Sequence, residues 1–218
     1  MASAVSASTS GQLSRVVLDE DGFVVLKGSE FGRRVRDFAG KGFPLKSAEG
    51  LDFCKGNILN DDRVRGVIES EFPRCGLGAY TVLDTAQRKP GFFLYPGEPA
   101  RQALVVQLWS NASRVLFYKG SHLGRSLQPT NGDRLLEIST DRLPMSPVEL
   151  VFEDGGLTIL DGRLCFQIIH GFALTLVFAA PERLGKFAKM ILPDSPDLKA
   201  QVDRMTTAKI GFNYEYKS

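Results

Sequence analysis

A small set of side chains in this sequence could transfer protons or hold a ligand. His122 and His170 are its two imidazoles, and an imidazole or a carboxylate such as Glu98 can act as a general acid or base. Tyr95 adds a phenol close to Glu98 in the sequence. Around these four predicted catalytic residues lie side chains that we predict to bind substrate: Arg101, Gln107, Trp109, Cys165, Phe166 and Gln167.

The residue types that bind metals are scarce and poorly spaced. An iron(II) oxygenase site needs two imidazoles and a carboxylate on one face, so both histidines would have to serve as ligands. Three cysteines (Cys54, Cys75 and Cys165) form no CxxC pair, which argues against a zinc site and a disulfide framework. We therefore predict three free thiols in a reducing compartment, which favours a cytoplasmic protein, and no metal site.

Length and composition indicate one globular domain. The 218 residues are 43% apolar and 24% charged, and the net charge of +2 is too small to favour nucleic acid as a partner. No apolar run is long enough to span a membrane. Residues 1–14, rich in Ala and Ser, predict a disordered tail, and residues 15–218 predict a single domain.

From Ala79 onward, short apolar runs separated by turns predict a barrel or sandwich. Helical spacing and capping residues predict flanking helices from Ser29 to about Phe38, from Asp61 or Asp62 to Phe72, and over 197–206. Residues 45–60 look irregular, and 123–147 are typical of a lid or crossover loop. The aromatic C-terminal tail predicts an edge strand or a homodimer contact. The predicted strands are Tyr80–Leu83, Phe92–Tyr95, Ala103–Trp109, Arg114–Tyr118, Val148–Phe152, Leu157–Leu160 and Leu174–Phe178.

Three stretches resemble the phytanoyl-CoA dioxygenase-like proteins, which are iron(II)/2-oxoglutarate oxygenases. Residues 155–180 (GGLTILDGRLCFQIIHGFALTLVFAA) resemble the C-terminal half of their double-stranded β-helix. Val106-Gln107-Leu108-Trp109 and Gly120-Ser121-His122 resemble a second strand pair and its turn, and the opening DEDGFVVL with its helix resembles their start. The resemblance implies a mainly β fold: a jelly-roll or cupin-like barrel with flanking N- and C-terminal helices.

The residues that carry the family's chemistry are substituted. Phe166 stands where the resemblance places an iron-binding His, and LYPGEPARQALV contains no His-x-Asp. Residues 174–177 contain no Arg that could hold 2-oxoglutarate. In the family, the His of Gly-Ser-His generally supports the fold near the pocket, which applies here to His122. We therefore predict that neither iron nor 2-oxoglutarate is a cofactor.

Three functions fit this pattern. The first is a metal-independent enzyme that isomerises, cyclises or rearranges a small apolar metabolite, in keeping with a family that often serves specialised metabolism. The second is an oxygenase with an atypical ligand set such as His122, His170 and Glu98. The third is a non-catalytic protein that binds a metabolite or a partner, which a barrel filled by Trp109 and Phe166 would favour. Each candidate residue also has a structural interpretation, as a core, turn or surface-pair residue.

Overall fold

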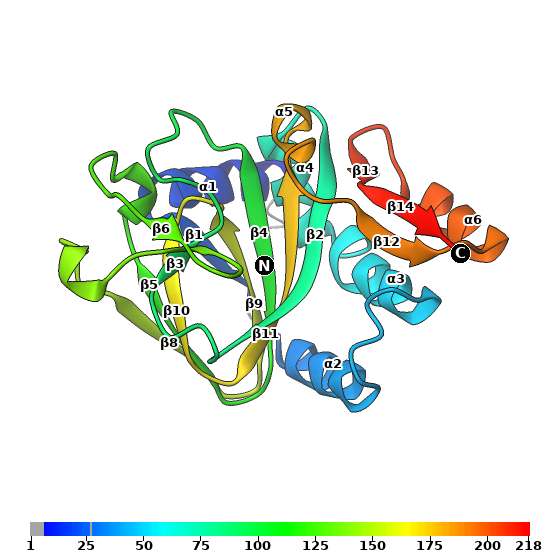
Figure 1. Cartoon of the computed structure of the whole chain (residues 1–218), viewed down its shortest axis with the longest axis horizontal. Coiled ribbons are helices and arrows are strands. Elements are labelled where there is room, and N and C mark those ends of the chain that lie inside the picture. Colours follow the sequence, from blue (N-terminus) through cyan, green and yellow to red (C-terminus); the bar gives the residue numbers. More distant parts are fainter. Residues whose placement is uncertain (1–6, 27) are drawn as a thin grey trace, which may run out of the picture.

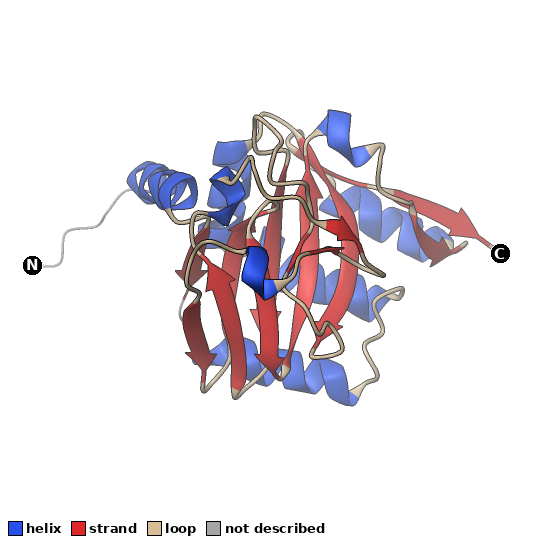
Figure 2. Ribbon diagram, turned by 60° about the vertical axis from the view of Figure 1, so that its left-hand side comes forward, coloured by secondary structure: helices blue, strands red, loops and turns tan. Residues whose placement is uncertain are grey.

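A computed structural model of the chain describes residues 7–26 and 28–218. Two six-stranded sheets face each other, and helices cover the outer face of one of them (Figures 1 and 2). The first sheet, called sheet A here, has the strand order β1 (Phe23–Leu26), β9 (Gly156–Asp161), β4 (Ala103–Trp109), β11 (Phe172–Ala179), β2 (Cys75–Asp84) and β13 (Ile210–Phe212).

The second sheet, sheet B, contains the shorter strands. Its order is β6 (Thr130–Asn131), β7 (Leu136–Glu137), β3 (Gly91–Phe92), β10 (Cys165–His170), β5 (Ser113–Tyr118) and β8 (Val148–Phe152). The chain passes from sheet A to sheet B between β2 and β3, β4 and β5, and β9 and β10. This alternation is that of a double-stranded β-helix, so the predicted fold class is confirmed.

Helices pack against sheet A on the side away from sheet B. They are α2 (Ser29–Gly40), α3 (Ala48–Cys54) with a π-helical turn (Lys55–Leu59), α4 (Asp62–Glu71) and α6 (Pro196–Met205). Helix α1 (Ala7–Glu20) packs on α4, and the short helix α5 (Pro181–Leu184) follows β11. The helices predicted from Ser29, Asp62 and Asp197 are thus present, with Asp61 capping α4 through Arg63 N. Gly28, not Ser29, precedes α2.

Two predictions for the N-terminal half were wrong. Residues 45–60 are mostly helical, because Ser47 caps α3 and its Leu51 and Cys54 are buried against the core. Residues 7–14, predicted to lie in a disordered tail, begin α1, a helix anchored by the buried Leu18. Residues 1–6 lie outside the described residues.

The C-terminal aromatic residues belong to strands, as the edge-strand prediction proposed. Phe212 lies in β13, which pairs with β2 in parallel, and Tyr214 and Tyr216 lie in β14 (Tyr214–Lys217), paired with β12 (Met190–Pro193). These aromatic rings pack against the core on the helical side of sheet A. The homodimer contact predicted for the same aromatic residues stays a prediction.

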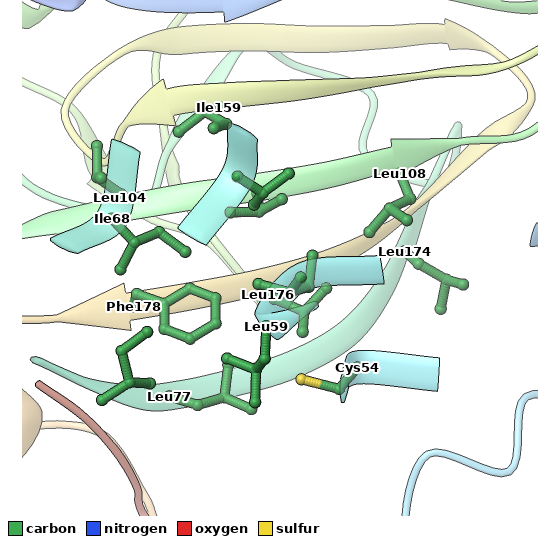
Figure 3. Packing of buried hydrophobic residues seen from close by; sticks show 14 of the residues in the cluster. Cys54, Leu59, Ile68, Leu77, Leu104, Leu108, Ile159, Leu174, Leu176 and Phe178 are labelled. Atoms are coloured by element: carbon green, nitrogen blue, oxygen red, sulfur yellow. The ribbon is translucent and has the colours of Figure 1, made fainter. Parts of the chain in front are cut away.

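Strand periodicity gives sheet A two different faces. On β4, Leu104, Val106 and Leu108 point towards the helices and join a large apolar core with residues such as Ile68 of α4 and Phe178 of β11 (Figure 3). The alternate residues Ala103, Val105 and Trp109 point into the space between the two sheets. We call this space the barrel interior.

All three cysteines of the chain are free and buried. In the described part of the chain, none of the helices has both the length and the apolar character needed to cross a bilayer.

Candidate functional site

A row of polar side chains crosses the barrel interior on sheet A. Gln107 of β4 is paired with Thr158 of β9 on one side and with Thr175 of β11 on the other. Thr175 is in turn paired with Thr81 of β2. Because directly paired residues point to the same face of a sheet, these four side chains form one line, which we call the polar row. The row runs from fully buried residues to the half-buried Thr81 near the sheet edge.

Trp109 closes one end of the polar row. Its indole Nε1 donates a hydrogen bond to Thr158 Oγ1 at 2.9 Å, and its ring stacks on Phe152 with the ring centres 5.2 Å apart. Phe117 meets the indole edge-on at 6.3 Å. The predicted position of Gln107 and Trp109 on one interior face is therefore correct, and Trp109 is a fixed part of the wall.

Gln107 is the exceptional member of the row. Its side chain is 0% exposed, and neither Oε1 nor Nε2 has a hydrogen-bond partner among the described residues. A buried primary amide without partners costs roughly 1–3 kcal/mol, so most native proteins pair such groups with protein, water or ligand. Gln107 thus presents a free donor and a free acceptor to the barrel interior.

The opposite wall, from sheet B, is apolar and aromatic. Phe166 and Ile168 of β10 and Val115 and Phe117 of β5 all belong to the inter-sheet cluster. Phe166 is 0% exposed and stacks on Phe93, with the ring centres 6.0 Å apart. The interior therefore has one wall with amide and hydroxyl groups and one wall of rings and aliphatic chains.

The interior does not fit an iron(II) centre. Phe166, at the position where the resemblance places an imidazole, offers no lone pair, and its stacking partner Phe93 follows β3, near the expected place of the His-x-Asp motif. Across residues 7–26 and 28–218, no group of three or more His, Cys, Asp or Glu side chains could hold a metal ion. The inward-facing residues of β11 include Ala173, Thr175 and Val177, none of which could hold a 2-oxoglutarate carboxylate.

The predicted binding residue Arg101 lies outside the interior, in a buried ion cluster. Its guanidinium contacts Asp161 at 2.9 Å, Glu71 at 2.7 Å and Asp19 at 2.7 Å. Arg163 forms a bidentate pair with Asp161 at 3.0 and 2.7 Å. Burial would raise the pKa of Asp161, but Arg163 and Arg101 outweigh it and hold this pKa below its ordinary value. The cluster ties α1 and α4 to the β9–β10 turn.

Two predicted acid–base residues belong to the same end of the barrel. Glu98 pairs with Arg183 at 2.9 Å, and its carbonyl accepts a hydrogen bond from Arg163. His122 is 1% exposed, and its Nε2 lies 3.1 Å from the Asp19 carbonyl oxygen. Burial lowers the pKa of His122 below its ordinary value, more than the Asp19 carbonyl raises it. Both residues make contacts that support the fold, while His122 Nδ1 and Glu98 Oε2 have no partner among the described residues, and the catalytic role of the two residues stays a prediction.

The remaining predicted residues do not converge either. His170 is exposed at the far end of β10, opposite Arg114. Cys165 faces a separate outer cluster, where burial raises the pKa of its thiol, and Gln167 donates to the Arg88 carbonyl. These side chains miss the interior because the alternation of β10 turns only Phe166 and Ile168 inward. Tyr95 is half-buried in a turn, with its ring against Gly97.

The atypical iron site is contradicted by the same geometry. His122 follows Tyr118, which pairs with Cys165 at the start of β10, whereas His170 ends that strand. Five residues of strand separate these ends by about 17 Å. His122, His170 and Glu98 therefore cannot share one metal ion.

A surface pocket lies where sheet A and sheet B part. Its volume is about 230 Å³, and its floor includes Leu83 and Leu135, which both belong to the inter-sheet cluster. Leu83 lies two residues after Thr81 on the same face of β2, next to the outer end of the polar row. The rim carries Asp84, Asp133, Arg134 and Glu137.

Comparison with solved structures identifies the fold. SnoN, a non-heme alpha ketoglutarate dependent epimerase from nogalamycin biosynthesis, has a TM-score of 0.54 and 16% sequence identity, covering 79% of this chain and 84% of its own. The carbocyclase SnoK from the same biosynthesis has a TM-score of 0.51 and 11% identity, covering 82% and 87%. EctD from S. alaskensis, solved with 2-oxoglutarate and 5-hydroxyectoine, has a TM-score of 0.53 and 12% identity, covering 82% and 77%.

The chain has the fold of the iron/2-oxoglutarate oxygenases. No protein-family model and no curated protein matches the sequence. The resemblance therefore holds at the level of the fold, and the phytanoyl-CoA dioxygenase-like assignment remains a prediction.

Sequence reasoning missed three members of the polar row: Thr81, Thr158 and Thr175. Each threonine alone is unremarkable in a strand, and the row exists only once the strand register is known. The usable signal was Gln107, a polar residue at an inward position of an otherwise apolar strand. A neutral donor and acceptor facing an aromatic wall can bind an uncharged molecule and polarise its carbonyl.

Proposed function

We propose that this chain is a metal-independent isomerase or cyclase that acts on a small, largely apolar metabolite. The observation that carries this proposal is the buried Phe166 ring, stacked on Phe93 at the position where the resemblance places an iron ligand. A side chain without a lone pair at that position argues against oxygen activation by iron. The proposed reaction is therefore a redox-neutral rearrangement.

The interior favours catalysis by positioning rather than by proton transfer. His122 Nε2 and Glu98 Oε1 make contacts at the charged end, and His170 is exposed at the other end. An aromatic wall can hold an apolar substrate in a reactive conformation, and the Gln107 amide can donate to a carbonyl that gains negative charge. Both effects act without metal or redox cofactor.

The similar structures support a role in specialised metabolism. SnoN and SnoK are an epimerase and a carbocyclase of nogalamycin biosynthesis, so this fold hosts stereochemical inversion and ring closure. Both are alpha ketoglutarate dependent, whereas the present interior has no residue suited to hold that dianion between the sheets. We therefore propose for this chain the same class of transformation, inversion or ring closure, without the alpha ketoglutarate-dependent oxidation.

The test is turnover by chelator-treated protein. Purified protein in EDTA is incubated with polyketide, terpene and peptide precursors, and products are separated by chromatography and mass spectrometry. The proposal predicts products that have the mass of their precursors, that form without oxygen uptake, and that are unchanged by added Fe(II) and 2-oxoglutarate. Turnover that requires iron and yields succinate would overturn it.

A second candidate, a non-catalytic metabolite-binding protein, is favoured by the filled interior. The rings of Trp109, Phe117, Phe152 and Phe166 occupy space in which substrate would react. Under this alternative, the same incubations show saturable binding of a precursor with no product. Retention of the unchanged precursor through gel filtration would favour this second function.

A further inference from the structure

We infer that the polar row is a binding site for an uncharged, oxygen-bearing molecule that enters beside β2, with Gln107 as its main hydrogen-bonding contact. This inference rests on the proposed function, because it takes the interior to be free of iron and 2-oxoglutarate. It adds the chemical class of the ligand, the residues that bind it and its route of entry.

The first argument is the unpaired amide. Gln107 is 0% exposed, both of its polar atoms lack partners in the described part of the chain, and paired neighbours Thr158 and Thr175 share its face. The nearby polar groups are partly committed, since Thr158 accepts from Trp109 and Thr175 Oγ1 lies 3.4 Å from the Ala173 carbonyl. A ligand carbonyl could accept from Gln107 Nε2, and a ligand hydroxyl could donate to Oε1.

The second argument is charge, which selects a neutral ligand. The buried polar side chains of the interior are amide and hydroxyl groups, and the buried Asp161 and Arg163 pair with each other at the charged end. The pocket beside β2 is lined by three carboxylates, one of which (Glu137) lies 3.7 Å from Lys89, and by Arg134, whose Nη1 donates to the Val82 carbonyl. Such a lining does not favour an anion, and an unpaired charge inside would be costly to bury.

The third argument is the shape of the wall. Adjacent strands lie about 4.8 Å apart, so the row from Thr158 to Thr81 spans about 14 Å. The wall opposite it consists of apolar side chains such as Phe166, Phe117 and Val115. A ligand with a mostly hydrocarbon body and an oxygen on one side matches both walls. The half-buried Thr81 and the adjacent Leu83 place the entry at the pocket near the sheet edge.

Trp109 provides a direct readout. It is the single tryptophan of the chain, is fully buried, and lies two residues from Gln107 on the same face. Its emission can be followed while chelator-treated full-length protein is titrated with two pairs of probes: cyclohexanone with cyclohexane, and camphor with bornane. Camphorsulfonate serves as the anionic analogue of camphor.

We expect at least one ketone to shift the Trp109 emission saturably and to bind about tenfold more tightly than its hydrocarbon, the value of roughly one net hydrogen bond. Camphorsulfonate should show no saturable shift. In Gln107→Leu, the preference for the ketone should disappear while hydrocarbon binding persists, which shows that the variant is folded. The matched variant Gln167→Leu, altered on the outer face of β10, should keep the preference.

The absence of ketone preference in both pairs, or a preference that survives in Gln107→Leu, would overturn the inference. Chelator is present throughout, so either result counts against the polar row alone. Iron-dependent turnover, measured separately, would count against the proposed function.

Discussion

The barrel interior and the charged end of the barrel differ in how their most deeply buried polar groups are paired. At the charged end, Arg101 contacts three carboxylates, and Asp161 receives both Arg101 and Arg163. In the interior, Gln107 is equally buried and has no partner among the described residues. The guanidinium groups and Asp161 of the charged end are thus paired and hold the fold, although Glu98 Oε2 and His122 Nδ1 there have no hydrogen-bond partner among the described residues. In the interior, both polar atoms of Gln107 keep hydrogen-bonding capacity for a ligand.

The contacts of a buried polar side chain, rather than its residue type, separate structural from functional residues in this chain. By residue type alone, Glu98, Arg101 and His122 are better candidates for chemistry than an amide and three threonines. The contacts reverse that order for Arg101, because a charge paired on several sides cannot also bind substrate without leaving its partners unpaired in an apolar environment.

The largest expected effect is at the charged end. Arg101→Ala should lower the free energy of unfolding by about 3–5 kcal/mol, because it leaves the buried carboxylates of Asp161 and Glu71 without this partner. Urea denaturation at pH 7 measures the change. Arg114→Ala, which breaks the exposed pair with Glu149, should cost less than about 1 kcal/mol. Equal costs for the two variants would contradict the distinction drawn here.

The aromatic wall of the interior gives the next effect. Phe166→Ala removes a fully buried ring and should cost about 3 kcal/mol, near the lower end for such changes because the half-buried Phe93 can move towards the gap. Thermal and urea unfolding measure it, with the exposed neighbour Ile169→Ala as control. A loss below about 1 kcal/mol would show that the ring is not packed as core.

The polar row should respond in the opposite direction. Gln107→Leu replaces a buried unpaired amide with an apolar group and should raise the free energy of unfolding by about 1–2 kcal/mol in ligand-free protein. Differential scanning calorimetry without added ligand tests this. Destabilisation by the same amount would mean that Gln107 is already satisfied, and the contrast between the two regions would fail.

The smallest effect concerns pH. The folded protein holds the pKa of His122 below its ordinary value of 6.5, so the neutral ring contributes stability that is present above pH 6.5 and is lost as the pH falls below it. The pKa of Asp161 is lowered and that of Arg101 is raised, so both keep their charges over this range. Between pH 7 and pH 5 we expect a loss of about 1 kcal/mol that His122→Gln removes.

Much of the fold could be predicted from the sequence. The bounds of β4 and β8 were predicted to the residue, and Asp61 was one of the two residues proposed as the cap of α4. Residues 165–170 were not recognised as a strand, because their inward and outward positions both carry apolar side chains at the start. Residues 45–60 were missed as helix because their stability comes from burying Leu51 and Cys54, which local patterns do not show.

The site was less predictable. Period-two alternation placed Gln107 and Trp109 correctly on one face of β4. The other members of the polar row come from strands more than 25 residues away, and only the strand register brings Thr81, Thr158 and Thr175 into line with Gln107. The ion cluster was equally hidden, since Arg101 and Glu71 meet only after α4 packs beside the β9–β10 turn.

The most direct test of the central claim is the iron content of the protein. Full-length protein is purified without chelator, reconstituted anaerobically with Fe(II) and 2-oxoglutarate, desalted, and analysed by plasma mass spectrometry. With Phe166 and Phe93 in the barrel interior, we expect iron far below one ion per chain, before and after reconstitution. One tightly held iron per chain would contradict the account.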